Sequence, residues 1–287
     1  MTLGRVKTLI VLSIARLRAV RTAGGGPMEL DRLSGSLGAR VEGIRLQGAS
    51  PETLSALKDK LLDHKVLVIS GDVLDPVELL AFAQGLGTPQ VHPVVPHLEG
   101  FPGVIEIRNF GKAYTLNEHW HSDVMFEAEP PDFTILQARA VPDAGGDTLF
   151  ANQTQAFDQL SAGFKTLLNG LRAVHSGAGL ATMMGGAAAP EAIHPVVRTH
   201  PETGQPALYV CRAFTKRFEG MTAQESRPLL DYLYRWAVRT DFTCRVRWAP
   251  GDLVIWDNRC VQHYAVHDHG DAERVLYRVT VGASRPC

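Results

Sequence analysis

The feature that most restricts the fold is a series of short segments, from residue 103 onward, rich in β-branched and aromatic residues and bounded by turn-forming residues. Such segments are typical of β-strands. The predicted strands are 103–109, 132–141, 147–152, 171–176, 194–200, 207–211, 243–248, 252–257 and 274–283. Many short strands with a few helices favour a mainly β protein, either a double-sheet jelly roll or a similar β-sandwich.

Three helices are predicted to pack against these strands. Residues 50–65 begin with Ser50 as a cap, followed directly by proline, and their leucines follow helical spacing. Residues 75–87 form a second helix that ends in glycine, and residues 222–239 form a third. The Gly- and Ala-rich stretch 176–192 is either a mobile lid or an ordinary surface loop.

The composition limits the classes of partner. The net charge is −1, so no basic excess favours binding to nucleic acid or to an anionic membrane. The four cysteines form no CxxC pair, and we interpret them as reduced thiols of a cytoplasmic protein. Residues 1–27 combine basic residues with a short apolar run. We interpret them as a disordered or artefactual N-terminal extension, with a targeting segment as the alternative.

Three candidate metal ligands stand at alternate positions in the stretch EHWHSDVMFEAEPPDF: His119, His121 and Asp123. Successive side chains of a β-strand point to opposite faces. A strand here therefore places His121 and Asp123 on one face, about 6–7 Å apart. A His-x-Asp pair occurs by chance in many chains, so it needs a third ligand from elsewhere.

That third ligand is predicted in GDLVIWDNRCVQHYAVHD, where His263 follows a predicted strand and a short bend. Two histidines and one carboxylate on a β-sandwich form the facial triad typical of non-haem Fe(II) oxygenases, which leaves three iron positions open. His267 and His269 are rival ligands in a polar turn.

Arg274 and Arg278 stand four residues apart on the last predicted strand and therefore share a face. If that face is buried, both guanidinium groups need anionic partners, because an unpaired buried charge is costly. Arginine binds carboxylates and sulfonates through paired hydrogen bonds. An exposed face with solvated arginines is the alternative, and the nearby His263 favours anion binding.

Two segments, WHSDVMFEAEPPDFTILQARAVPDAGGDTLFAN and GDLVIWDNRCVQHYAVHDHGDAERVLYRVTVG, resemble the two signature regions of the taurine/2,4-dichlorophenoxyacetate dioxygenase family. The resemblance extends over about residues 31–286 and includes HPVVRTHPETGQPALYV. It implies a double-stranded β-helix (jelly-roll) core with packing helices, in a single dioxygenase domain over residues 28–287. It also implies dependence on Fe(II), 2-oxoglutarate and O2, and a dimer or tetramer.

The resemblance implies functions for three groups of residues. The iron ligands are matched by His121, Asp123 and His263. The residues that bind the distal carboxylate of 2-oxoglutarate are matched by Thr148 and Arg274. In sulfonate-using members the substrate anion is held by a residue that matches Arg278. Other substrate-pocket positions are matched by His92, Asn117, Val124 and Phe214.

The implied reaction hydroxylates a C–H bond of a small organic anion, such as a sulfonate, an alkyl sulfate or an aryloxyalkanoate, with succinate and CO2 as coproducts. Val95 stands where the taurine enzymes carry a tyrosine that contacts the sulfonate, so taurine itself is disfavoured. The region 177–192 is shorter and richer in Gly and Ala than in those relatives. His119 is not a usual ligand in the family, and we expect it beside the ligands or in the pocket wall, with a surface position as the alternative.

Two alternatives remain. A zinc hydrolase using His119, His121 and Asp123 resembles the pattern His-x-His-x-Asp-His, but Val124 replaces its last histidine and the arginines have no function there. A non-catalytic jelly-roll binding protein with a vestigial metal site is the second alternative. Oxygen-dependent formation of succinate separates the dioxygenase from both.

Overall fold

The largest sheet has seven strands. The structure is a computed structural model that describes residues 28–71, 73–109, 118–186 and 189–287. The strands lie in the order β1 (Glu29–Arg32), β2 (Ala39–Glu42), β3 (Val66–Ile69), β13 (Leu253–Asp257), β5 (Phe133–Ala140), β15 (Arg274–Val281) and β4 (Ile105–Asn109). Only the β2–β3 pair within this sheet is parallel.

A second, three-stranded sheet packs against the large sheet. Its order is β12 (Thr243–Val246), β6 (Thr148–Asn152) and β14 (Val261–Ala265). Alternate residues fill the space between the sheets: Val254 and Trp256 from the large sheet meet Phe150 and Val261 from the second. Two facing antiparallel layers of this kind confirm the predicted mainly β, jelly-roll architecture.

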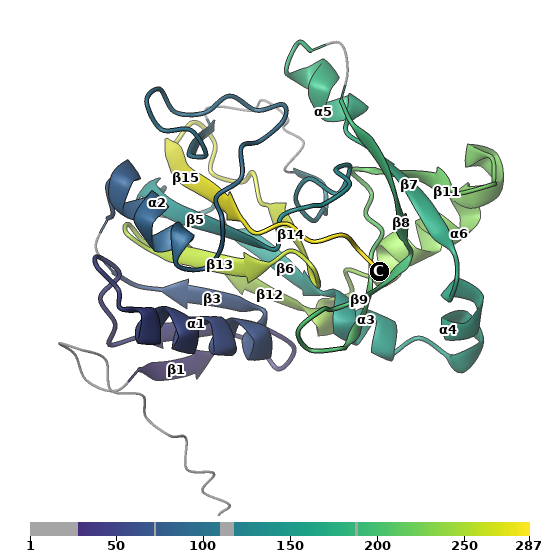
Figure 1. Cartoon of the computed structure of the whole chain (residues 1–287), viewed down its shortest axis with the longest axis horizontal. Coiled ribbons are helices and arrows are strands. Elements are labelled where there is room, and N and C mark those ends of the chain that lie inside the picture. Colours follow the sequence, from purple (N-terminus) through teal and green to yellow (C-terminus); the bar gives the residue numbers. More distant parts are fainter. Residues whose placement is uncertain (1–27, 72, 110–117, 187–188) are drawn as a thin grey trace, which may run out of the picture.

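Two helices cover the other face of the large sheet, as Figure 1 shows: α1 (Pro51–His64) and α2 (Pro76–Gln84). Leu57 of α1 and Leu79 of α2 belong to the same apolar core as the strand residue Ile255. The predicted cap is present, because the Ser50 side chain accepts a backbone hydrogen bond at the start of α1. The central strands β3, β13 and β5 of the large sheet are therefore buried on both faces.

A third group of elements lies beside the two sheets, in the right-hand part of Figure 1. Its strands are β7 (Arg172–Ser176), β8 (Glu191–Pro195), β9 (Val197–Thr199), β10 (Pro206–Leu208) and β11 (Thr215–Phe218). Its helices are α3 (Gln153–Asp158), α4 (Ala162–Leu168), α5 (Ala178–Met183), α6 (Ala223–Trp236) and the 3-10 helix η2 (Thr240–Phe242). Leu230 and Leu233 of α6 pack with Phe218 in a separate core.

Some of the predicted segments differ from the structure. Residues 194–200 do not form one strand, because β8 and β9 are separated at Val196. The stretch 176–192 contains the short helix α5, which has no side-chain cap and therefore gave no helix signal in the sequence. The predicted N-terminal extension, residues 1–27, lies outside the described residues.

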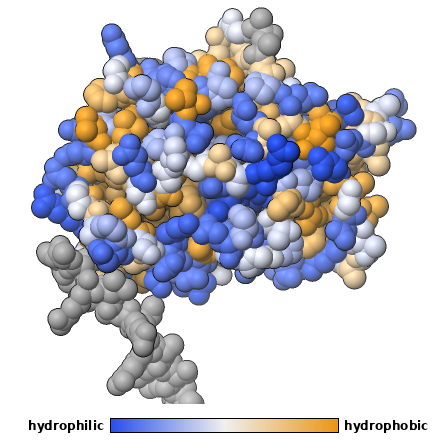
Figure 2. Space-filling view, in the orientation of Figure 1, coloured by the Kyte–Doolittle hydropathy of each residue, from blue (hydrophilic) through white to orange (hydrophobic). Residues whose placement is uncertain are grey.

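The surface seen in Figure 2 mixes hydrophilic and apolar residues. Within the described part of the chain, no helix is long and apolar enough to span a bilayer.

Candidate functional site

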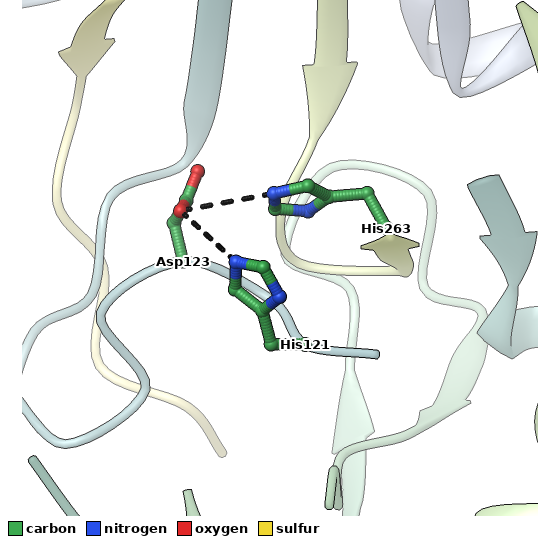
Figure 3. A group of neighbouring side chains, drawn as sticks. All are labelled: His121, Asp123 and His263. Carbon is green, nitrogen blue, oxygen red and sulfur yellow. Dashed lines mark ion pairs between the residues drawn. The ribbon is translucent and has the colours of Figure 1, made fainter. Parts of the chain in front are cut away.

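The candidate ligands His121, Asp123 and His263 meet in the buried interior, and we call these three residues the site group. Figure 3 shows both imidazoles facing the same carboxylate. Nε2 of each histidine lies 3.9 Å from Oδ1 of Asp123. This distance is too long for a hydrogen bond but suits ligands that share one ion.

An isolated β-bridge and a turn bring the site group together. The backbones of His121 and His263 exchange two hydrogen bonds, of 3.1 and 2.8 Å. Asp123 lies in a turn, and Val124 follows it with φ of 51°. The predicted strand through residues 121 and 123 is therefore wrong, because this left-handed conformation of a β-branched residue turns the chain sharply.

Both histidines of the site group are neutral, as metal ligands must be, and the tautomer of His121 is fixed by a hydrogen bond. Nδ1 of His121 lies 2.6 Å from the carbonyl oxygen of His119, which only accepts. Nδ1 therefore carries the ring proton, and Nε2 presents its lone pair. Burial lowers the pKa of His121 and lowers the pKa of His263 to about 3, so both rings are neutral at neutral pH.

Asp123 is ionised between them. Burial alone raises its pKa, but Arg278 and the other groups around it outweigh burial and leave the pKa below its ordinary range. Nη1 of Arg278 donates to Oδ1 at 3.2 Å, and the Thr134 hydroxyl donates to Oδ2 at 2.6 Å. Two neutral imidazoles and one carboxylate, with no hydrogen bond among them, form a donor set that fits a ferrous ion.

The other histidines considered as ligands lie apart from the site group. The His119 side chain is exposed, so its expected place beside the ligands or in the pocket wall is wrong. Nδ1 of His267 lies 2.8 Å from Oε1 of Glu118, and its ring stacks on His269. The zinc arrangement that requires the His119 ring is not formed.

A small cavity of about 20 Å³ borders His263 and contains both Arg274 and Thr148 in its wall. Nε of Arg274 donates to the carbonyl of Gly146 at 2.8 Å, and Nη2 donates to the Thr148 hydroxyl at 3.4 Å. Burial lowers the pKa of Arg274 to about 10, so it remains a cation at neutral pH. Among the described residues, no carboxylate forms an ion pair with it.

Sequence reasoning missed two residues around this cavity. Nε1 of Trp248 donates to the Thr148 hydroxyl at 3.0 Å, and Oδ1 of Asn109 accepts from Nη1 of Arg274 at 3.2 Å. Neither belongs to a recognisable motif. Asn109 is placed by its pairing with Arg274 across β4 and β15, a register that only the folded sheet defines.

A larger cavity, of about 340 Å³, borders His121 and Asp123. Arg278 lines this cavity as well as the small one. Its Nε and Nη2 atoms are buried and have no hydrogen-bond partner among the described residues. The predicted pocket residues that also line the larger cavity are His92, Val124 and Phe214. The predicted pocket residue Asn117 lies outside the described residues.

His92 is a fixed hydrogen-bond donor in this wall. Its Nδ1 accepts the backbone N–H groups of Val94 and Val95, at 3.0 and 2.9 Å. The ring proton is therefore on Nε2. Burial, reinforced by Arg278, lowers the pKa of His92 to about 3, so the ring stays neutral.

Much of the remaining wall is apolar. It comes from β4 on one side and from α5 and the residues next to it on the other. The apolar side chains include Val95, Ile105, Ile107, Leu180, Met183 and Met184. Met183 and Met184 are half exposed, so they lie at the rim of the cavity.

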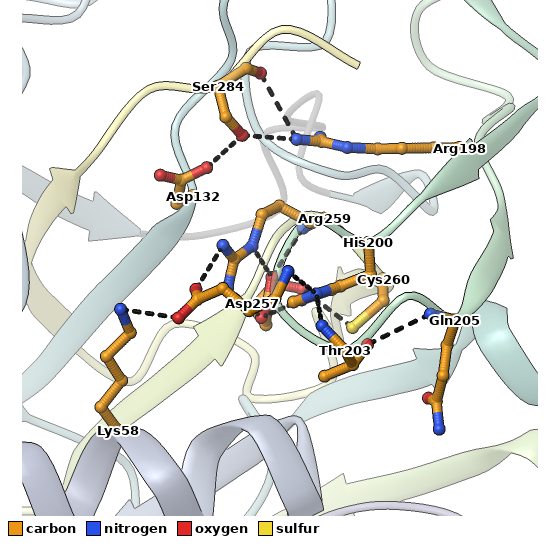
Figure 4. Close-up of polar contacts among 11 residues, drawn as sticks. Lys58, Asp132, Arg198, His200, Thr203, Gln205, Asp257, Arg259, Cys260 and Ser284 are labelled. Atoms are coloured by element: carbon orange, nitrogen blue, oxygen red, sulfur yellow. Dashed lines mark hydrogen bonds and ion pairs between the residues drawn. The ribbon is translucent and has the colours of Figure 1, made fainter. Parts of the chain in front are cut away.

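A second buried group, His200, Asp257 and Cys260, which we call the anchor group, also has its ligand atoms within 4.8 Å of one another. Figure 4 shows Arg259 beside Asp257, and its Nε and Nη2 donate to the two carboxylate oxygens at 2.8 and 2.7 Å. Nδ1 of His200 accepts two backbone N–H groups, so Nε2 carries the proton that it donates to Asp257 at 2.9 Å. No imidazole lone pair is left for a metal, and the anchor group is an ion-pair cluster.

Comparison with known proteins gives one consistent result. The profile described as "Taurine catabolism dioxygenase TauD, TfdA family" matches residues 29–280. An alkylsulfatase of Acinetobacter baylyi is 36% identical over 274 residues, covering 88% of this chain and 84% of the relative. An alpha-ketoglutarate-dependent sulfate ester dioxygenase of Pseudomonas putida is 35% identical over 281 residues, covering 90% of this chain and 91% of the relative. A solved taurine dioxygenase structure, described as putative, from Burkholderia xenovorans has a TM-score of 0.80 at 33% identity, covering 90% of this chain and 91% of its own.

Proposed function

Because this chain belongs to the TauD, TfdA family of 2-oxoglutarate-dependent dioxygenases, we propose that it hydroxylates a C–H bond of a small organic anion with an apolar body. The observation that carries this proposal is the convergence of His121, Asp123 and His263 beside two cavities. One cavity contains Arg274, and the other contains the partly unpaired Arg278. The site therefore combines a metal donor set with two buried cations, one for 2-oxoglutarate and one for an anionic substrate. A dioxygenase needs both cations, whereas a zinc hydrolase does not.

The site group is assigned to Fe(II). The His119 carbonyl fixes the tautomer of His121, and Arg278 helps to keep Asp123 ionised. Bound iron supplies the activation of O2 and the oxidation of the substrate, while 2-oxoglutarate is converted to succinate and CO2. The chain holds three ligands and leaves the remaining positions to cosubstrate and O2.

Thr148 and Arg274 are assigned to the distal carboxylate of 2-oxoglutarate. The Thr148 oxygen already accepts from Trp248 and from Arg274, so its own proton is free to be donated. A carboxylate at this place accepts that hydrogen bond and pairs with a buried guanidinium that forms no ion pair among the described residues.

Arg278 and His92 are assigned to the anionic head of the substrate. Arg278 has two unpaired nitrogen atoms, and His92 is a neutral donor in the same wall. Val124 and Phe214 line the same cavity, and Asn117 keeps its assignment to this pocket from the family resemblance.

The apolar wall favours an aliphatic or aryl body over a small zwitterion such as taurine. Val95 lines the cavity and cannot donate a hydrogen bond to a sulfonate. Alkyl sulfates, alkanesulfonates and aryloxyalkanoates combine an anionic head with such a body, and sulfate esters appear in the name of a relative. Buried apolar surface then supplies much of the affinity for the substrate.

The test is succinate release with Fe(II), 2-oxoglutarate and O2, measured against alkyl sulfates of increasing length, alkanesulfonates, aryloxyalkanoates and taurine. We expect kcat/KM to rise about fourfold per CH2 while the chain remains inside the cavity, since each buried CH2 contributes about 0.8 kcal/mol. Taurine is expected to be the poorest substrate. Zinc-dependent hydrolysis without consumption of 2-oxoglutarate, or no succinate with any of these anions, would refute the proposal.

We further propose that residues 28–287 act as one catalytic unit in a cytoplasmic homo-oligomer, a dimer or a tetramer. The family resemblance supports this assembly. Light scattering on the purified full chain measures its mass directly, and a monomer at micromolar concentration would contradict it.

A further inference from the structure

The two carboxylate oxygens of Asp123 have different partners. Oδ1 is the atom that lies 3.9 Å from Nε2 of His121 and of His263. Oδ2 accepts the hydroxyl proton of Thr134 at 2.6 Å. Asp123 and Thr134 are both buried, so bulk water does not replace this hydrogen bond. The hydroxyl therefore occupies Oδ2, while Oδ1 faces the histidines and accepts one hydrogen bond from Arg278.

The direction of the hydrogen bonds around Thr134 is fixed by Trp256. An indole N–H only donates, and Nε1 of Trp256 lies 2.8 Å from Oδ1 of Asn258, so that atom is the amide oxygen. The amide nitrogen of Asn258 then donates to the Thr134 hydroxyl oxygen at 2.6 Å. The proton of Thr134 is left to be donated to Asp123.

Asn258 also holds the backbone of Asp123. Its Oδ1 accepts the N–H of Asp123 at 3.3 Å, so Asn258 and Thr134 bind the backbone and the side chain of one residue. Val124 follows directly in a left-handed conformation, which costs about 1–3 kcal/mol for such a residue. These hydrogen bonds help to hold Asp123 at the start of a strained turn.

The anchor group fixes the turn that carries Asn258. Asp257 directly precedes Asn258 in the sequence. Figure 4 shows that Arg259 and His200 both donate hydrogen bonds to the Asp257 carboxylate. Nη1 of Arg259 donates to Glu202 at 2.7 Å, which ties the turn to a distant segment of the chain. The position of Asn258 therefore depends on an ion-pair cluster that needs no metal.

We propose that Thr134 and Asn258 are positioning residues that keep Asp123 a one-oxygen ligand of the iron. This inference rests on the proposed function, in which Asp123 binds iron through Oδ1. A carboxylate that bound through both oxygens would occupy a further coordination position. That position is needed by 2-oxoglutarate or O2, so the hydroxyl of Thr134 keeps the coordination site open.

The test is an anaerobic titration in two stages. Fe(II) is added first, and 2-oxoglutarate is then added at saturating Fe(II), with its binding followed by the visible charge-transfer absorption. Thr134→Val keeps the shape but removes the hydroxyl. We expect its affinity for Fe(II), its affinity for 2-oxoglutarate, or both to fall about tenfold to a hundredfold, as for other residues that orient a metal ligand. Thr134→Ser keeps a hydroxyl at this position and is expected to retain most of the wild-type affinity for Fe(II) and for 2-oxoglutarate.

Thr280→Val is the matched control, because Thr280 pairs with Thr134 across β15 and is also buried. It is expected to leave both affinities unchanged. Asn258→Asp is the second variant and covers a failure of Thr134→Val to fold. It replaces the amide donor by an acceptor and draws the Thr134 proton away from Asp123, so the same losses are expected.

The outcomes distinguish a failure of the positioning role of Thr134 and Asn258 from a failure of the proposed dioxygenase function. Wild-type affinities for Fe(II) and 2-oxoglutarate in whichever of Thr134→Val and Asn258→Asp folds would overturn the positioning role. A wild-type protein that binds no Fe(II), or gives no absorption with 2-oxoglutarate, would instead overturn the proposed function. A changed unfolding midpoint with unchanged affinities would show that Thr134 is only structural.

Discussion

Two buried groups of this protein each bring three possible ligand atoms within 4.8 Å of one another: His121, Asp123 and His263 in the site group, and His200, Asp257 and Cys260 in the anchor group. The backbone around each group makes them different. A carbonyl faces Nδ1 of His121 and leaves the lone pair on Nε2, whereas two N–H groups face Nδ1 of His200 and place the proton on Nε2. The tautomer, rather than the residue type, decides which group can bind a metal.

The carboxylates of the two groups, Asp257 and Asp123, also differ in their hydrogen-bond partners. Both oxygens of Asp257 are bound by Arg259, whose third nitrogen binds Glu202. Asp123 receives one hydrogen bond from Arg278, which keeps two nitrogen atoms without partners among the described residues. The carboxylate of the anchor group is fully paired with the cation Arg259, whereas the site group can receive a metal cation, together with an anion at Arg278.

The largest effect is expected from breaking the anchor group. Asp257→Ala leaves Arg259 buried without its main counter-ion and should lower the free energy of unfolding by about 3–5 kcal/mol. Asp123→Ala, measured with a chelator present, should cost less because Arg278 makes only one hydrogen bond to Asp123. Urea unfolding measures the free energy of unfolding of both variants. Equal decreases would contradict the difference between the two carboxylates.

The next effect is stabilisation by the metal. Fe(II) at about 100 times its Kd should stabilise the wild-type protein by about 2.7 kcal/mol. The same addition should leave His121→Ala unchanged, because the site group then lacks one imidazole. Anaerobic thermal unfolding measures this, and an equal rise in Tm for His121→Ala would place the metal elsewhere.

Arg278 gives a smaller, selective effect. Arg278→Ala should weaken binding of the primary substrate by about 1.5–3 kcal/mol, the usual worth of hydrogen bonds to a charged group. Binding of 2-oxoglutarate should change less, and Arg274→Ala should show the reverse preference. Separate titrations of the two ligands check the pair, and equal loss of both in Arg278→Ala would contradict the assignment.

The anchor group also predicts a pH dependence of stability. Burial alone raises the pKa of Asp257, but hydrogen bonds from Arg259 and His200 outweigh it and leave the pKa below its ordinary range. A depressed pKa stabilises the fold above the unfolded value of about 3.9, and this contribution is lost as the pH falls below it. The wild type should lose up to about 1.4 kcal/mol per pH unit from this group, a slope absent in Asp257→Asn. Urea unfolding at several acidic pH values measures both slopes.

The smallest effect concerns the strained residue next to the site group. Val124 is buried, so Val124→Gly loses apolar contacts and adds flexibility, but it also removes the cost of a left-handed valine, and the net loss in the free energy of unfolding should be only about 1 kcal/mol. Val254→Gly, at a buried strand position of ordinary conformation, is the control and should cost several times more. Similar losses for the two variants would argue against strain at Val124.

The sequence predicted the fold well where local signals and burial agree. The predicted cap at Ser50 is present. The predicted apolar strand β13 is also present, and its side chains point alternately into the core under the helices and into the core between the two sheets. The convergence of His121 with His263 was predicted, although the strand through Asp123 was not formed. The contributions of Trp248, Thr134 and Asn258 could not be predicted, because they depend on contacts between distant segments whose register is set only in the folded protein.

The most direct test of the account is the number of ferrous ions bound per chain under anaerobic conditions. We predict that the wild type and Cys260→Ala each bind one Fe(II) and develop a visible absorption band with 2-oxoglutarate, whereas His263→Ala does neither. Iron that remains bound in His263→Ala but is lost in Cys260→Ala would contradict the account, because it would assign the metal to the anchor group.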